Sequence, residues 1–214
     1  MKVTELQEKM WEQKDVHIGK KHDSKLKAAA KEKMGMFSRS FFESIQVIVI
    51  ALLVVVIIYM FIGSFNIVDG DSMEPNFESK ELIISEKITT NFGTLQRGDV
   101  IVFASPIGKD FIKRIIGMPG EKIKIMNGQI YINGNLLNER YLSDSNKFFS
   151  GGTYLKDGDE QIIPDNNYFC MGDNRNASYD SRAIGPVDKS KIKGKAWVVF
   201  WPLDKFHIVS HEGY

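Results

Sequence analysis

The sequence contains little cysteine and no excess of charge of either sign, and each shortage excludes a class of protein. Cys170 is the single cysteine among 214 residues, so neither an internal disulfide nor a cysteine-based zinc site can form. Lys and Arg number 28, and Asp and Glu number 27. A chain so evenly charged has no global electrostatic reason to bind nucleic acid.

Histidine is also scarce, which limits metal chemistry. No HExxH motif or comparable spacing occurs, so no metal site is predicted and no metal cofactor is expected. The four histidines are His17, His22, His207 and His211.

Residues 41–62 form a long apolar run, FFESIQVIVIALLVVVIIYMFI. As a helix rising about 1.5 Å per residue it would extend roughly 33 Å, enough for a bilayer core. A buried core helix is the alternative, but no face of the run is polar. Forty residues precede it and no Ala-x-Ala-like site follows, which favours a retained transmembrane anchor over a cleaved signal peptide.

The charges that flank this run predict its orientation. Seven Lys or Arg residues lie between Lys20 and Arg39, whereas Lys80 is the single basic residue between Gly63 and Leu82. By the positive-inside rule, residues 1–40 are a cytoplasmic segment and residues 66–214 are extracytoplasmic. The protein is therefore predicted to cross the cell membrane once, with the lipid bilayer as a partner.

Residues 66–214 predict a mainly β domain, because short β-type runs alternate with turn signals. Asn127-Gly128 favours a type I′ hairpin, and Asn133-Gly134 follows one strand later. Residues 134–164 are polar and turn-rich, as in a small excursion from the main sheet. The expected strands are Glu81–Glu86, Asp99–Ala104, Phe111–Ile116, Lys122–Met126, Gln129–Ile132, Tyr168–Met171 and Ala196–Trp201.

The first segment with possible chemistry is DGDSMEP at 69–75. Gly70 permits unusual backbone geometry and Pro75 interrupts regular structure, so Ser72 lies on a constrained turn. An ordinary Asp/Ser/Pro turn is the alternative interpretation.

The second segment is FIKRIIGMPGE at 111–121. Strand alternation places Lys113 and Arg114 on opposite faces, so one of the two cations shares an apolar face. Burial can make a lysine neutral near pH 7–8 and therefore basic, whereas a guanidinium does not deprotonate. An edge strand whose cations reach solvent is the alternative.

The third segment, GDNRNASYDSR at 172–182, follows the apolar strand 168–171 directly. It is either a capped loop or a polar network that orients another site. A Ser-His-Asp triad would need a histidine near Ser72, but His17 and His22 lie before the predicted anchor. His207 and His211 follow the last clear strand. Ser72 and Lys113 remain as the best nucleophile–base pair.

Together these residues resemble the bacterial type I signal peptidases. GDSMEP at 70–75, RGDVIVF at 97–103, IKRIIGMPGE at 112–121 and GDNRNASYDSR at 172–182 resemble four family motifs in the right order behind one anchor. The short cap and single anchor are similar to enzymes of Gram-positive bacteria.

The resemblance implies a mostly antiparallel β catalytic core with a small inserted cap, about 127–164. It implies a serine endopeptidase without a cofactor that removes signal peptides from secreted preproteins after Ala-x-Ala-like sequences. Ser72 would be the nucleophile and Lys113 the general base, with Ser178 hydrogen-bonded to the lysine. Supporting roles fall to an Asp180–Arg182 ion pair and to Asp173, and substrate pockets to Met73, Phe111 and Ile112.

Two positions depart from the family pattern. Gly70 stands where some members carry a serine that completes the oxyanion hole, so another donor is expected to substitute. Asn76 stands where threonine is common, and we expect this position to tolerate the change. A self-cleaving Ser-Lys protease and a catalytically inactive anchored β domain are the alternative functions, although the intact Ser72 and Lys113 argue against an inactive relative.

Overall fold

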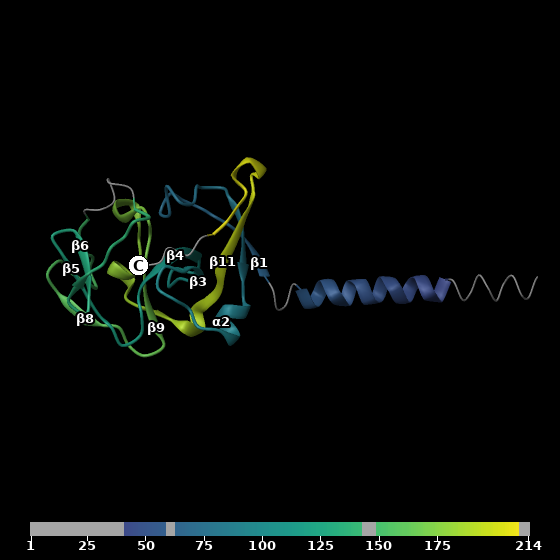
Figure 1. Ribbon diagram of the computed structural model, residues 1–214, viewed down its shortest axis with the longest axis horizontal. Coiled ribbons are helices and arrows are strands. Elements are labelled where there is room, and N and C mark those ends of the chain that lie inside the picture. Colours follow the sequence, from purple (N-terminus) through teal and green to yellow (C-terminus); the bar gives the residue numbers. More distant parts are fainter. Residues whose placement is uncertain (1–40, 59–62, 143–148, 210–214) are drawn as a thin grey trace, which may run out of the picture. The chain divides into compact units, whose positions relative to one another are not determined.

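The computed structural model describes residues 41–58, 63–142 and 149–209 (Figure 1). The chain divides into two units, residues 1–56 and 57–214. The predicted cytoplasmic segment, residues 1–40, lies outside the described residues, as do residues 59–62 of the predicted anchor.

The described part of the first unit is an apolar helix, Phe41–Ile58, whose last two residues fall in the second unit. Its 18 residues are long and apolar enough to cross a membrane, and none of them is buried. Length and composition alone make this helix a candidate membrane span.

The β domain is built on a sheet whose strand pairs, within the described residues, are all antiparallel. Sheet order differs from chain order, because β11 lies between β2 and β3. Among the described residues the sheet has eight strands, in the order β1 (Gly63–Ile67), β2 (Leu82–Glu86), β11 (Ile192–Trp201), β3 (Val100–Ala104), β4 (Asp110–Gly117), β9 (Asn167–Met171) and β10 (Val187–Asp188), with β12 (His207–Ile208) beside β11.

Both faces of this sheet are covered, as the apolar run of β3 requires. Val100 and Val102 pack in one core cluster, and Ile101 and Phe103 pack in another. Strand alternation sends these pairs to opposite faces. A strand buried on both sides is therefore apolar throughout, and it forms a rigid support for its neighbour β4.

A second, antiparallel sheet follows β4 in the chain. Asn127 and Gly128 both have positive φ, at 53° and 72°, and they connect β5 to β6 as the hairpin prediction requires. The predicted cap, about 127–164, contains the last three strands of this sheet but not β5, so the sheet begins earlier than the expected cap. Within the described residues its order is β7 (Asn135–Leu136), β6 (Gln129–Ile132), β5 (Lys122–Met126) and β8 (Glu160–Ile162).

The β domain has little helix in its described residues, which confirms the mainly β fold class. All seven predicted runs are strands, whereas β1 and the short strands β7, β8, β10 and β12 were not predicted. The short helices are α2 (Ile88–Phe92), α3 (Ser181–Ile184) and the 3₁₀ turns η2 (Arg175–Ala177), η3 (Lys189–Lys191) and η4 (Leu203–Lys205).

Candidate active site

Ser72 lies on a compact turn between β1 and β2. Gly70 opens the turn with a φ of +95°, a region that favours glycine. The Phe77 N–H donates to the Met73 carbonyl at 3.0 Å, and both of these side chains are buried in the core. The side chains of Met73 and Phe77 therefore fix the turn to the core, while Ser72 stays half-buried at the surface.

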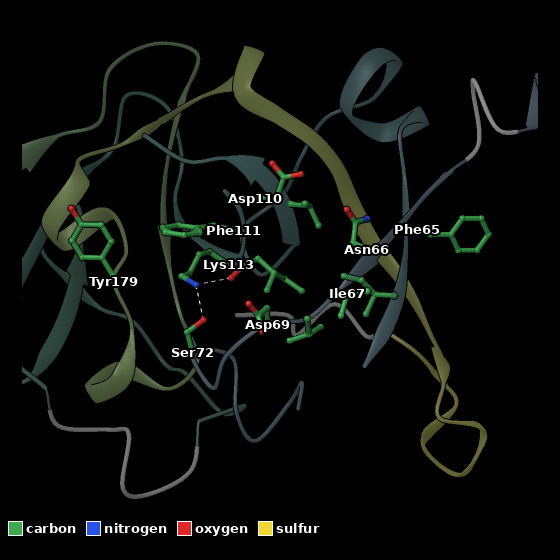
Figure 2. Close-up of a pocket in the computed structure, with 13 residues that line it drawn as sticks. Phe65, Asn66, Ile67, Asp69, Ser72, Asp110, Phe111, Lys113 and Tyr179 are labelled. Carbon is green, nitrogen blue, oxygen red and sulfur yellow. Dashed lines mark hydrogen bonds between the residues drawn. The ribbon is translucent and has the colours of Figure 1, made fainter. Parts of the chain in front are cut away.

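Lys113 comes to this turn from β4, where it pairs with Ile101 of β3. Its Nζ lies 2.7 Å from Ser72 Oγ and 2.8 Å from the Ile112 carbonyl oxygen (Figure 2). The Phe111 ring is 5.1 Å from the same nitrogen. Two residues 41 positions apart in the sequence thus meet at hydrogen-bond distance.

The surroundings of Lys113 lower its proton affinity. The residue is 4% exposed, and this burial lowers its pKa from 10.5 to about 8. Asp180 and Asp173 act in the opposite direction, but burial dominates. A substantial fraction of the lysine is therefore a neutral amine at mildly alkaline pH, which is the form that can accept a proton.

Asp173 holds Arg114, the residue that follows Lys113. Arg114 Nε and Nη2 donate to the two carboxylate oxygens at 2.8 and 2.6 Å, and Nη1 donates to the Gly98 carbonyl at 2.9 Å. Both partners are buried, so the pair is a fixed bidentate contact. Arg114, on the opposite face of β4 from Lys113, therefore links this strand to Asp173. As a guanidinium it cannot act as a base.

The expected Asp180–Arg182 ion pair is present. Arg182 Nε and Nη2 donate to the two oxygens of Asp180, both at 2.8 Å. Asp180 also caps helix α3 by accepting from the Arg182 backbone N–H, and it accepts from Gly172 N at 3.1 Å. Its carboxylate thus fixes the loop 172–182 at both ends.

Ser178 is close to the pair, but its hydroxyl does not bond to Lys113. Its buried Oγ has no hydrogen-bond partner within the described part of the chain. It lies instead against Gly172, where an added Cβ would stand 2.3 Å from it. The hydrogen bond from Ser178 to the lysine, which the resemblance implied, is therefore absent from this structure, although the residue lies at the site.

A groove of about 440 Å³ opens beside Ser72 and Lys113. Phe111 and Ile112 line it, as predicted, and so do Tyr179 and residues of β1. Figure 2 places Tyr179 and Phe111 on one side and Asn66 on the other, with Phe65 pointing away. Met73 is not among the residues that line the groove, because the turn directs its side chain inward, where it is fully buried in the core.

One edge of β4 is open along this groove. Its residues from Asp110 to Arg114 pair with β3, whereas β9 pairs with it only between Arg114 and Gly117. The second edge of Asp110–Lys113 thus has no strand partner in the described ranges. An extended peptide could add there and bring its backbone past Ser72.

Sequence reasoning missed the contacts that the cap makes with the site. Arg175 is fully buried and donates to both oxygens of Glu139. The Arg114 guanidinium lies 4.3 Å from the centre of the Tyr141 ring. Arg175 belongs to a recognised motif, but nothing in the polar segment around Glu139 and Tyr141 marked either residue.

The remaining candidates lie away from the pair or outside the described residues. His207 is exposed on β12, and Cys170 is buried in β9, where burial raises the pKa of its thiol. His17, His22 and His211 lie outside the described ranges. In the described part of the chain, no group of three or more His, Cys, Asp or Glu side chains could hold a metal ion.

Comparison with known proteins identifies the family. The model of the signal peptidase family, peptidase S26, matches residues 41–201. Signal peptidase I S of Bacillus subtilis is 38% identical over 78% of this chain and 92% of its own length. Signal peptidase IB of Staphylococcus aureus is 34% identical over 74% of this chain and 90% of its own.

Two further proteins are similar to the chain over different shares of its length. A probable signal peptidase I-2 of Synechocystis is 30% identical over 87% of this chain and 85% of its own length. A solved signal peptidase I from Enterococcus faecalis is 33% identical, covers 48% of this chain and 96% of its own, and has a TM-score of 0.40. The chain belongs to the signal peptidase family, the S26 peptidases, and is a hydrolase of the signal peptidase I type.

Proposed function

We propose that the chain removes signal peptides from secreted preproteins by means of a Ser72–Lys113 dyad and that it cuts after small residues. The observation that carries this proposal is the 2.7 Å contact between Ser72 Oγ and a lysine whose burial lowers its pKa to about 8. A serine is a weak nucleophile until a neighbouring base takes its proton, and a neutral amine at this distance can do so.

The reaction follows from these two groups. Neutral Lys113 Nζ takes the Ser72 hydroxyl proton as Oγ attacks the scissile carbonyl carbon. The resulting ammonium protonates the leaving amine, the peptide C–N bond breaks, and an acyl-enzyme ester remains. Lys113, neutral again, then takes a proton from water, whose oxygen attacks the ester, and Ser72 recovers its proton as the C–O bond breaks.

The backbone at Ser72 supports this chemistry. The Ser72 N–H donates to no backbone carbonyl within the described residues, so it is available to the oxyanion. Gly70 has no side chain that could donate to the oxyanion. The Ser79 hydroxyl lies beside Gly70 and accepts from its N–H at 3.2 Å.

The groove supports an extended substrate. A peptide added to the open edge of β4 would form backbone hydrogen bonds, and its alternate side chains would point into the pockets. Phe111, Ile112 and Tyr179 take up space beside the lysine. Large side chains would collide with this wall, so residues as small as alanine suit the positions next to the cut.

We also propose that the enzyme is anchored in the cell membrane with its N-terminus in the cytoplasm and residues 66–214 outside. The apolar helix Phe41–Ile58 and the positive charge before it support this orientation. The β domain adds exposed apolar side chains on β1, β11, β12 and the segment between the last two, which suit contact with lipid. They are Phe65, Ile67, Trp197, Trp201, Leu203, Phe206 and Ile208.

A cleavage assay on a purified preprotein tests the dyad directly. We expect Ser72→Ala and Lys113→Arg to fold and yet to lose cleavage, because the first lacks the nucleophile and the second cannot release its proton near neutral pH. Ser150→Ala is the matched control: the exposed Ser150 bonds to Arg182 through its carbonyl, which the substitution keeps. Near-normal turnover by Ser72→Ala would contradict the proposed mechanism. Cleavage of the enzyme itself without cleavage of the preprotein would support the self-cleaving alternative.

A further inference from the structure

Asn76 makes two hydrogen bonds to residues outside its own turn. The residue is half-buried and lies four positions after Ser72 on the same turn. Its single amide nitrogen donates to Asp173 Oδ2 at 2.9 Å and to the Tyr141 carbonyl oxygen at 3.2 Å. Both N–H groups of one amide therefore point to residues distant in the sequence.

The first partner leads to the strand of the base. Asp173 is fully buried, and its carboxylate also binds Arg114 through two hydrogen bonds. Arg114 follows Lys113 directly on β4. One carboxylate is thus bonded both to the turn that carries Ser72 and to the strand that carries Lys113.

The second partner leads to the cap. The Tyr141 ring lies against Arg114, with the guanidinium carbon 4.3 Å from the ring centre. Its hydroxyl accepts from Arg175 at 3.0 Å and donates to Glu139 at 2.6 Å. The segment of the cap that Asn76 bonds is therefore itself held in place by buried charged groups.

We propose that Asn76 is a positioning residue: its amide ties the Ser72 turn to Asp173 and to the cap residue Tyr141, and so holds Ser72 Oγ in register with Lys113. The inference rests on the proposed function of the dyad. Asn76 does not line the groove, so it affects the reaction through the distance between nucleophile and base rather than through substrate binding.

This role has a kinetic signature. Loss of the amide frees the turn to shift against β4, and a small displacement between reacting groups slows the chemical step strongly. We therefore expect kcat to fall while KM stays nearly constant. A residue that only shaped the fold would change the amount of folded enzyme but not kcat for each folded molecule.

The test compares two substitutions of the same shape in the full-length enzyme in detergent. Asn76→Val removes every donor, whereas Asn76→Thr keeps one hydroxyl donor. We expect Asn76→Val to lower kcat about tenfold, the effect typical of one lost hydrogen bond to a charged group, and Asn76→Thr to stay within about twofold of the wild type. The folded fraction of each variant is measured by circular dichroism, and Asn76→Ala with Asn76→Ser repeats the comparison if the valine variant does not fold.

Equal kcat for Asn76→Val and the wild type would overturn the inference, as would a threonine variant that is as slow as the valine variant. Ser72→Ala in the same assay separates this failure from that of the proposed function. If Ser72→Ala is inactive while the Asn76 variants are normal, the dyad stands and the positioning role is wrong. If Ser72→Ala still cleaves, the proposed function itself fails.

Discussion

Lys113 is both buried and in contact with a group that substrate can reach, two properties that are seldom found together in a lysine. It is almost completely buried, and it keeps a polar contact with a hydroxyl that a substrate can reach. The groups that act on its protonation besides burial are Asp180, Asp173, Cys170 and Arg182. Asp180 and Asp173 are both bound to arginines, which weakens their attraction for the ammonium.

The pH dependence of turnover follows from the lowered pKa of Lys113. Since the pKa in the folded protein is about 8, the neutral base accumulates as the pH rises through that value. We expect kcat/KM to rise about tenfold for each pH unit below about pH 8 and then to level off. A series of pH–rate measurements with one preprotein checks this.

His207→Ala is the control, because His207 is the one histidine of the β domain within the described residues and is exposed. Its removal should leave the profile unchanged. A rate limb near the ordinary histidine pKa that disappears in this variant would contradict the assignment of Lys113 as the base.

At the scale of elements, the joint between β9 and the loop 172–182 fixes the position of the nucleophile turn. The Asn174 N–H donates to the Ser72 carbonyl at 3.1 Å, so the loop and the turn share a backbone contact. A Cβ added at Gly172 would stand 2.3 Å from both the Ser72 carbonyl oxygen and Ser178 Oγ. Only a glycine allows this approach.

Gly172→Ala should therefore reduce kcat by about tenfold to a hundredfold, because the Ser72 backbone must move to make room. Preprotein cleavage by the purified variant measures the effect. Gly134→Asn is the control: a Cβ there meets nothing within 4 Å, and asparagine tolerates the positive φ of this turn. If Gly172→Ala were as active as the control, the joint would not constrain Ser72.

The elements themselves were largely predictable from the sequence, and the contacts between them were not. Period-two apolar runs and Asn-Gly turns depend on neighbours in the chain, so strands such as β5 and β6 were found. The Ser72–Lys113 pair was found because few residue types can act as nucleophile and base. The burial of the Met73 side chain and the hydrogen-bond partners of Asn76 depend on which strands meet in space. Local sequence patterns do not contain that information.

Strand β1 shows the same limit. The run Gly63–Ile67 carries a weak alternation, and it becomes a strand through its pairing with β2. Pairing with β2 satisfies the backbone N–H and C=O groups of β1, which outweighs its modest strand propensity.

At the scale of the whole molecule, the proposed topology has a direct test. Protease added outside intact cells should digest residues 66–214 and spare residues 1–40, because the positive flank of the helix stays in the cytoplasm. Antibodies against each end of the chain would report the fragments. Cells made permeable with detergent are the control, in which both ends should be digested. Protection of the C-terminal domain in intact cells would contradict both the orientation and the proposed contact with secreted preproteins.

The burial of Lys113 also affects the free energy of unfolding of the entire β domain. Its pKa is about 8 in the folded protein and near the ordinary 10.5 in the unfolded chain, so the unfolded state binds the proton more tightly. At about 1.4 kcal/mol for each pH unit between the two values, the cost to the folded state is about 3 kcal/mol. The cost is fully present below pH 8 and disappears as the pH rises toward 10.5.

An apolar side chain of similar length should therefore make the protein more resistant to denaturant than its own active form. We expect Lys113→Met to increase the free energy of unfolding by up to about 3 kcal/mol at pH 7 and by much less at pH 10. Denaturant titrations of both proteins at the two pH values measure this. Arg114→Met should instead destabilise the domain at either pH, because it leaves the buried Asp173 carboxylate without its ion-pair partner.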